Sequence, residues 1–479
     1  MIVGLSRDLA KIKLSTSTNK DAEYRRAIFY ALKRRGGVYM KCLQVLAVTQ
    51  KFLDGWAGPA EMTVFDRLEA EEVKAERYVE MGNFIKFSEK PVATGSFAVV
   101  YRATLMSGEE VAVKILRPSI ERRLKSDLKQ LKMVARMLSR FLPKSILDYN
   151  TVIGEFARTC LLETDYGREV ENMEYFQKFY QGHPYVKIPK VYKVLCRKNV
   201  IVQEWIEGDT FASILAERSA GKPATALALE RTGSNLWTQM IVAGGEAVRM
   251  AMCADFVFGD PHPGNIKLLA DNKIAFIDFG IVASRPTSRK AFYDWVGAYR
   301  NVLMGKTAGV AKLAEATIMC FCPDVAMALR GCDMDGESAM EKILAGVRDK
   351  TNALVRSDVV ASDLFANGHL FRLFTEVLDG NNSLGLRLDM SNFQLVKAMQ
   401  AYLGSMTVLD NSETHDKFAG AMLAAMNYAL EYAEKVGIEN DLPVRSKYSR
   451  GENLEILIDT MSSLADGNEF LFEYLQGRR

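Results

Sequence analysis

Apolar residues recur at helical spacing in the first part of the chain. The stretch 21–35 predicts an amphipathic helix that ends at Gly36-Gly37. Further helices are predicted over 38–52 and 69–81. The apolar positions of the first helix are Tyr24, Ala27, Ile28, Ala31 and Leu32.

The period changes at about residue 83. From 83 to 117 apolar and polar residues alternate, and Ser107-Gly108 supplies a turn, which predicts three antiparallel strands. Helical patterns resume over 119–141, 150–178 and 227–254.

Two short strands are predicted next, Ile266–Leu269 and Ile274–Ile277, joined by a turn at 270–273. From about 288 to the end the pattern is helical. The order is a helical extension, a small β-rich lobe and a large α-rich lobe, so the predicted fold class is α+β.

The composition is typical of a globular protein with more than one packed unit. The chain has 479 residues, of which 48% are hydrophobic and 25% charged. A net charge of +3 gives no case for nucleic-acid binding. Residues 1–41 hold ten Lys and Arg against three Asp and Glu. The favoured interpretation of this basic stretch is a solvated helix face, and the alternative is a segment attracted to an anionic membrane surface.

The seven cysteines are scattered and form no CxxC pair, which favours structural thiols in a reducing compartment. No apolar run has the eighteen or so residues of a membrane span. Arg7 and Asp8 interrupt the stretch that a signal peptide would keep apolar. The prediction is a cytoplasmic protein, and an organelle transit peptide stays open.

The strongest chemical pattern is Asp260-Pro-His-Pro-Gly-Asn265, followed after the predicted hairpin by Asp278-Phe279-Gly280. Phosphoryl transfer needs a carboxylate near the attacking oxygen and oxygen ligands for magnesium. Kinases supply these with a D-x4-N motif and a downstream Asp-Phe-Gly. We therefore predict an ATP site in which Asp260 is catalytic and Asn265 and Asp278 are Mg²⁺ ligands.

A nucleotide loop and a lysine precede this pattern. The loop aligns with G-x-G-x-x-G-x-V of kinases, but Ala93 and Ala98 replace the first and third glycines. Lys114 follows Val100 by fourteen residues, and Ala112 shares its strand face, so an adenine-packing residue lies beside a phosphate-binding amine. The predicted nucleotide-binding residues here are Ala93, Thr94, Gly95, Ser96, Phe97, Ala98, Val100, Ala112 and Lys114.

Lys114 needs a carboxylate partner from a helix. The acidic segment 162–172 offers several, and we predict Glu169 for the catalytic ion pair, with a solvated helix face as the alternative.

The stretch 200–208 predicts a strand that runs into an interlobe hinge, with an ordinary buried strand as the alternative. Backbone groups near Glu204, Trp205 and Ile206 would meet the adenine edge.

The segment after Gly280 is short. Only Ile281 to Pro286 separate it from a helix capped by Thr287 or Ser288. Protein kinases place a long activation segment and an A-P-E motif there. A dedicated protein kinase is therefore not predicted.

Together these residues resemble the UbiB/ADCK family of atypical kinase-like proteins, associated with ubiquinone biosynthesis and lipid metabolism. The stretch Phe258–Asn265 is similar to the family's H-A-D-P-H-P-G-N, and Ala93–Ser96 falls on its A-A-A-S loop. Glu163-Thr164-Asp165 matches its E-x-D motif, and Lys41-Cys42-Leu43-Gln44 falls where it carries K-x-G-Q. The resemblance covers about residues 25 to 300.

The resemblance implies a bilobal kinase-like fold whose helical extension covers the nucleotide cleft. Three positions depart from the family pattern: Leu43 replaces the glycine of K-x-G-Q, Gly95 replaces the third alanine of the loop, and Phe258 replaces a histidine. The gating residues that the resemblance implies are Lys41, Gln44, Glu163 and Asp165.

The predicted organisation has four parts. They are the helical extension (1–82), the N-lobe (83–207), the catalytic part of the C-lobe (208–300) and the helical remainder of the C-lobe (301–479).

The predicted function is that of a Mg²⁺- and ATP-dependent atypical kinase or ATPase. By resemblance, its client is a lipid, an isoprenoid-quinone precursor or a partner enzyme of that pathway. The basic N-terminus suits peripheral membrane contact. Two alternatives stay open: a small-molecule kinase of aminoglycoside or choline type, and a non-catalytic nucleotide-sensing scaffold.

Overall fold

The computed structural model describes residues 73–95, 97–141, 149–218, 223–286, 288–303 and 416–435, together with scattered helical positions elsewhere. The chain divides into two compact units. The first consists of 1–171 and 191–205, and the second of 172–190 and 206–479. Residues 172–190 thus group with the second unit, whereas the sequence analysis placed them in the N-lobe. The four-part organisation stays a prediction.

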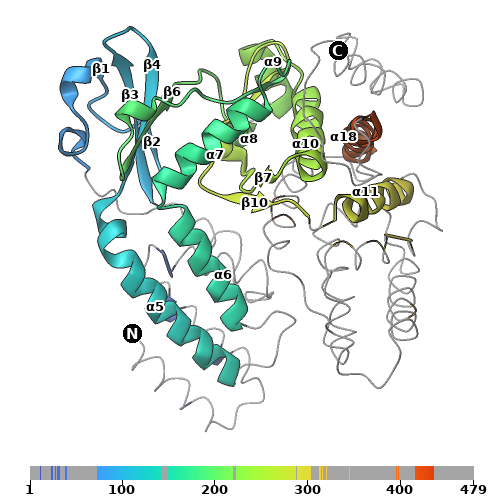
Figure 1. Ribbon diagram of the computed structural model, residues 1–479, viewed down its shortest axis with the longest axis horizontal. Helices are drawn as coiled ribbons and strands as arrows, with labels where there is room; N and C mark the ends of the chain where they lie inside the picture. Colours follow the sequence, from blue (N-terminus) through green and yellow to red (C-terminus); the bar gives the residue numbers. More distant parts are fainter. Residues whose placement is uncertain are drawn as a thin grey trace. The chain divides into compact units, whose positions relative to one another are not determined.

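A five-stranded antiparallel sheet forms the core of the first unit (Figure 1). Its order is β1-β3-β4-β6, and β2 also pairs with β3. The strands are β1 (Phe84–Phe87), β2 (Ala93–Thr94), β3 (Ala98–Leu105), β4 (Glu110–Leu116) and β6 (Val200–Glu204). The predicted strands and the turn at Ser107-Gly108 are confirmed, and Gly108 adopts a φ of +88° that favours glycine.

Alternation along the strands separates two faces of this sheet. One face packs into the apolar core through residues such as Tyr101, Val113 and Val202. The register pairs Val100 with Lys114 on the opposite face. Lys114 therefore lies on the face of the sheet that does not pack into this core.

The described part of one predicted helix is not α-helical, and another predicted helical stretch is interrupted. The described part of 69–81 contains only a 3₁₀ turn, η2 (Ala75–Arg77), and the start of another, η3 (Met81–Asn83). The predicted helix 150–178 is two helices, α6 (Tyr149–Leu162) and α7 (Tyr166–Phe179). The break has a local cause, because Asp165 Oδ1 accepts a hydrogen bond from Arg168 N and so caps α7.

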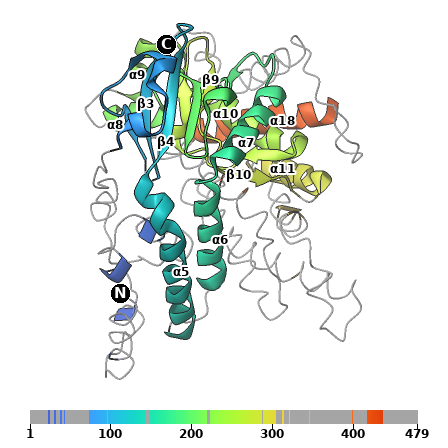
Figure 2. The ribbon, with the colours of Figure 1, turned by 60° about the vertical axis from the view of Figure 1, so that its left-hand side comes forward.

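The remaining elements of the first unit are also helical. The predicted helix 119–141 is confirmed as α5 (Pro118–Phe141), which lies beside α6 (Figures 1 and 2). A 3₁₀ turn, η4 (Lys193–Leu195), precedes β6.

The described residues of the second unit form two small sheets. One has the order β5-β9-β8, and the other pairs β7 with β10. The predicted hairpin at 266–277 is present, and its turn residues Asp271 and Asn272 adopt positive φ angles of 57° and 56°. The strands are β5 (Val186–Lys187), β7 (Phe256–Phe258), β8 (Ile266–Leu268), β9 (Ile274–Phe276) and β10 (Val282–Ser284).

Helices make up most of the described remainder of the second unit. They are α8 (Phe211–Arg218), α9 (Ala224–Thr232), α10 (Leu236–Cys253), α11 (Arg289–Leu303) and α18 (Asp416–Lys435), with a 3₁₀ turn, η5 (Pro263–Asn265), before β8. Every residue of α10 is buried. Helices α10, α11 and α18 lie side by side (Figures 1 and 2).

Helix α18 packs closely against α10 although the two are far apart in the sequence. A Cβ atom on Gly245 would lie 2.8 Å from the ring of Tyr428, so glycine permits this approach. The Tyr428 hydroxyl donates to Glu246 Oε1 over 2.6 Å. The sequence pattern predicted a helix in the region of α18, but it did not predict the packing of α18 against α10.

Glu246 is the centre of a buried polar cluster. Its carboxylate contacts Arg249 at 2.6 Å and His183 Nε2 at 3.2 Å, and all three side chains are at most 2% exposed. Burial by itself would raise the pKa of Glu246. Arg249, His183 and the Tyr428 hydrogen bond outweigh that effect and lower the pKa to about 2. The ionised carboxylate is therefore the stable form in this cluster.

The described segments include no helix with both the length and the apolar character that a bilayer crossing requires.

The packing of α18 on α10 can be tested with two matched variants. Tyr428→Phe removes the hydroxyl that donates to the buried Glu246, and should lower the free energy of unfolding by about 1–3 kcal/mol. Tyr293→Phe removes a comparable hydrogen bond to the exposed Glu434 and should cost less than about 0.5 kcal/mol. Denaturant titration of both variants measures the difference. Equal effects would contradict a supporting role for the buried bond.

Candidate functional site

Lys114 of β4 and Glu169 of α7 form the predicted ion pair. Lys114 Nζ lies 2.7 Å from Glu169 Oε1 and 3.0 Å from Oε2. The side chains are 16% and 1% exposed. The ammonium also lies 5.5 Å from the ring centroid of the buried Tyr166. A buried carboxylate requires such a cation, so the pairing fixes the lysine against α7.

The predicted nucleotide loop is a tight hairpin between β2 and β3. Gly95 N donates to Ala98 O over 2.8 Å. The Gly95 carbonyl accepts from Nε of the buried Arg117 at 3.2 Å. A Cβ on Gly95 would meet nothing closer than 3.6 Å, so this turn has room for the alanine that the family pattern carries.

Predicted loop residues differ in exposure. Ala93, Thr94 and Gly95 are exposed, whereas Phe97 and Ala98 are buried. Ser96 lies outside the described residues. The exposed part of the loop is therefore its first half, from which backbone groups can reach a ligand.

The predicted catalytic loop joins β7 to β8. Asn265 Nδ2 donates to the Asp260 carbonyl at 3.0 Å and lies 3.4 Å from Asp260 Oδ2. His262 Nδ1 accepts from Gly264 N at 3.1 Å, which closes η5. Both Asp260 and Asn265 are half-buried. The two predicted residues thus lie together, as the D-x4-N spacing implied.

Asp278 follows β9 directly. Its Oδ1 accepts from Gly280 N over 3.0 Å. The Ile277 amide donates to the Asn265 carbonyl over 3.1 Å, which joins this turn to the catalytic loop. Asp260, Asn265 and Asp278 therefore belong to one connected stretch of the second unit.

Aromatic side chains pack against Phe279 of the Asp-Phe-Gly turn. Phe279 is fully buried, and its ring lies 5.3 Å from Phe176 and 5.5 Å from Phe258. Phe258 also packs at 4.7 Å from Phe276. The phenylalanine that replaces the family's histidine thus supports the catalytic loop by packing. Gly259 beside it has no space for a Cβ, since three atoms of 281–283 would lie 3.0 Å away.

Asn172 was not selected from the sequence. Its Nδ2 donates to the Phe279 carbonyl over 2.8 Å, and the side chain is buried. Asn172 stands three residues after Glu169 on α7, so the two lie on the same side of that helix. The three-residue spacing from Glu169 is the sequence signal that could have identified Asn172 as a site residue.

The predicted strand at 200–208 is present as β6, and its role as an interlobe hinge stays a prediction. The Trp205 amide donates to the Glu110 carbonyl over 2.9 Å, so it completes the sheet and is not available to a base. Ile206 is buried, and its carbonyl accepts from Lys267 Nζ at 2.8 Å. The general prediction of backbone recognition at Glu204 to Ile206 stays a prediction.

The gating residues can be placed only in part. Glu163 is half-buried at the end of α6, and Asp165 is exposed and caps α7. Lys41 and Gln44 lie outside the described residues. Their predicted gating role stays a prediction.

The segment after Gly280 is as short as the sequence indicated. Strand β10 pairs with β7, and α11 begins at Arg289. Ser288 Oγ accepts from Ala291 N over 3.1 Å, so Ser288 is the helix cap. The described residues between Gly280 and α11 include no platform for a peptide.

The donor set of the second unit suits a hard divalent cation. Mg²⁺ prefers carboxylate and amide oxygens. Asp260 and Asp278 supply carboxylates, and because Asn265 Nδ2 is used on Asp260, its Oδ1 is the amide atom that can meet a cation. The residues present therefore fit the ion that the predicted chemistry needs.

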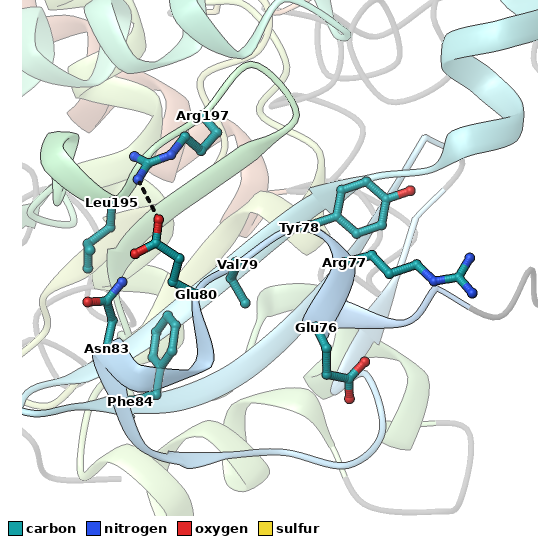
Figure 3. A pocket seen from close by; sticks show the side chains of 9 residues that line it. All are labelled: Glu76, Arg77, Tyr78, Val79, Glu80, Asn83, Phe84, Leu195 and Arg197. Atoms are coloured by element: carbon teal, nitrogen blue, oxygen red, sulfur yellow. Dashed lines mark ion pairs between the residues drawn. The ribbon is translucent and has the colours of Figure 1, made fainter.

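A cavity of about 260 Å³ lies elsewhere in the first unit, between η2, η3 and η4 (Figure 3). Its wall includes the exposed ion pair between Arg197 and Glu80, 3.7 Å apart, and Figure 3 shows Arg77 and Glu76 on its other side. The two glutamates and two arginines of this wall cancel in charge, so the wall has no net charge that would favour a charged ligand. None of the predicted nucleotide-binding residues lines it.

Sequence similarity identifies the family of this chain. Residues 63–301 match the model of the ABC1 atypical kinase-like domain. The chain belongs to this family. The UbiB/ADCK resemblance predicted from the sequence is therefore confirmed, as is an α+β kinase-like fold.

Two curated relatives illustrate the match. Protein ACTIVITY OF BC1 COMPLEX KINASE 1, chloroplastic, from Arabidopsis thaliana is 38% identical over 42% of this chain and 28% of its own length. The probable protein kinase UbiB from Marinobacter nauticus is 30% identical over 53% of this chain and 47% of its own length. The matched segment thus spans less than half of either relative.

A solved structure of a Mycobacterium tuberculosis protein in complex with erythromycin is also similar. It covers 78% of this chain and 96% of the solved chain, with 20% identity and a TM-score of 0.40.

The contact between Asn172 and Phe279 can be tested by amide hydrogen exchange. Asn172→Ala should speed exchange in peptides covering 277–283 by about tenfold, because one buried hydrogen bond is lost. Glu171→Ala, an exposed neighbour on α7, should change nothing. Exchange in β3 and β4 serves as the internal reference. Uniformly faster exchange in both regions would mean that the asparagine only stabilises the fold as a whole.

Proposed function

We propose that this chain is a Mg²⁺- and ATP-dependent phosphotransferase or ATPase of the UbiB/ADCK type. The observation that carries the proposal is the bidentate contact between Lys114 and the buried Glu169. Kinase-type phosphoryl transfer requires a lysine held by a helix glutamate. The connected stretch from Asp260 to Asp278 supplies the other groups that this chemistry needs.

Each group has a distinct proposed role. Lys114, oriented by Glu169, would bind the α- and β-phosphates. Asn265 and Asp278 would hold Mg²⁺, which when bound supplies neutralisation of phosphate charge. Asp260 would orient or deprotonate the attacking hydroxyl or water. Its backbone is fixed for this by the Asn265 amide.

The nucleotide loop and hinge complete the proposed site. Backbone groups of Ala93 to Ala98 would cover the phosphates, and those of Glu204 to Ile206 other than the Trp205 amide would meet the base. Val100 and Ala112 lie on the Lys114 face of the sheet, where the adenine ring would pack.

The proposed acceptor is a lipid, an isoprenoid-quinone precursor or water. The short segment before α11 supports an acceptor other than a peptide. The basic stretch 1–41 supports peripheral contact with an anionic membrane. The choice of a lipid or an isoprenoid-quinone precursor as the acceptor rests on resemblance to the UbiB/ADCK family.

The direct test is magnesium-dependent ATP turnover by the purified chain, with and without anionic liposomes. Labelled ATP and a total lipid extract would then show whether phosphate reaches a lipid. Transfer to a soluble alcohol or aminosugar would favour a small-molecule kinase. Nucleotide binding without turnover under all conditions would favour a nucleotide-sensing scaffold.

The metal role of Asp278 has its own test. Asp278→Asn should lower magnesium-dependent turnover by about a hundredfold or more, since one anionic ligand is lost. Asp271→Asn is the matched control, because it makes the same chemical change in the exposed turn of the same hairpin. Asparagine tolerates the positive φ at that position. Full activity of Asp278→Asn would remove the assigned role.

The ion pair is tested at the level of binding. Glu169→Gln keeps the shape of the side chain but removes the charge that orients Lys114. We expect nucleotide affinity to fall by about ten- to a hundredfold, the range for one charge-assisted hydrogen bond. Glu171→Gln, two residues further on the exposed side of α7, should bind as the unmodified chain does. Titration with a fluorescent nucleotide measures both. Unchanged affinity of Glu169→Gln would contradict the proposal.

A further inference from the structure

Lys267 makes contacts that its position in the β8–β9 hairpin does not require. It lies on β8 between Ile266 and Leu268, which are 1% and 0% exposed. Its Nζ donates to the Ile206 carbonyl at 2.8 Å and to the Gly208 carbonyl at 2.9 Å. Two carbonyls of one short segment are thus turned toward the same ammonium group.

Backbone contacts hold the same segment along β8. Leu268 N donates to the Asp209 carbonyl at 2.9 Å, and Thr210 forms a β-bridge with Lys267. Gly208 has a φ of +123°, and a Cβ there would lie 2.5 Å from the Leu268 carbonyl. Only glycine fits such a close approach. The stretch 206–210 is therefore laid against the strand that follows the catalytic loop.

Lys267 lies between two parts of the proposed site, the metal ligand Asn265 and the backbone that is proposed to bind the base. It stands two residues after Asn265, the proposed metal ligand. Its ammonium group binds the backbone directly after Glu204 and Trp205, where the base is proposed to bind. An ammonium with two carbonyl acceptors restricts both peptide planes more than a single neutral hydrogen bond would.

We propose that Lys267 is a positioning residue for the nucleotide base. It fixes the peptide planes at Ile206 and Gly208, and through them the orientation of the backbone groups that discriminate adenine from other purines. This inference rests on the proposed function, because it assigns a specificity role within the same nucleotide site.

The test compares two nucleotides that differ at the base edge. ITP has a keto oxygen where ATP has an amino group, so a fixed hinge backbone should prefer one of them. Calorimetric titration in the presence of Mg²⁺ gives the affinity of the full chain for each. The ratio of the two affinities is the decisive readout, since a role confined to stability would leave it unchanged.

Three variants make the comparison sharp. Lys267→Met removes the ammonium and keeps an unbranched side chain, and we expect about tenfold weaker ATP binding with a loss of most of the preference for ATP over ITP. Lys267→Arg keeps the charge in a different geometry and should give an intermediate ratio. Lys273→Met removes an exposed lysine of the same hairpin and should change neither affinity.

The outcomes separate this inference from the function on which it rests. If the unmodified chain binds neither nucleotide, the proposed function fails. If it binds ATP preferentially and Lys267→Met keeps the same preference, only the role of Lys267 is overturned. Thermal unfolding of each variant accompanies the titration, and Lys267→Arg supplies the ratio if Lys267→Met does not fold.

Discussion

A buried carboxylate must be paired with a cation, and this constraint organises both units of the chain. In the first unit the carboxylate is Glu169, which holds Lys114 on the face of the sheet opposite the apolar core. In the second it is Glu246, which holds Arg249 within α10. Removing either partner would leave an uncompensated charge in an apolar environment, which costs more than the pair contributes. Each pair therefore constrains the packing of the helix that carries its carboxylate.

Helix α7 shows how a short sequence can serve two purposes. Glu169, in its first turn, orients the lysine, and Asn172, one turn later, holds the backbone of the Asp-Phe-Gly turn. Both depend on where the helix begins, and Asp165 sets that position by capping it. A residue assigned by resemblance to gating thus has a local structural role as well. Register errors in this helix would displace both contacts together.

The sequence predicted the elements whose signals are local. Alternation in 83–117 and the two-residue turn at Asp271 marked strands and hairpins correctly, and the need of Lys114 for a carboxylate indicated Glu169. Elements of two or three residues, such as β7 and β10, are too short to show a period. The fit of Gly245 against α18 was also inaccessible, because a glycine within a helix does not indicate its distant partner. The ion pair between Lys114 and Glu169 was predicted because its residues belong to contiguous motifs, whereas the packing behind them comes from residues far apart in the sequence.

The hydrogen bond between Glu246 and Tyr428 joins residues 182 positions apart. During synthesis at about 5–20 residues per second, α10 emerges on the order of ten to forty seconds before its covering helix. Until then Glu246 lacks the hydrogen bond that Tyr428 donates. The speed of translation across the intervening segment therefore sets how long α10 lacks this contact.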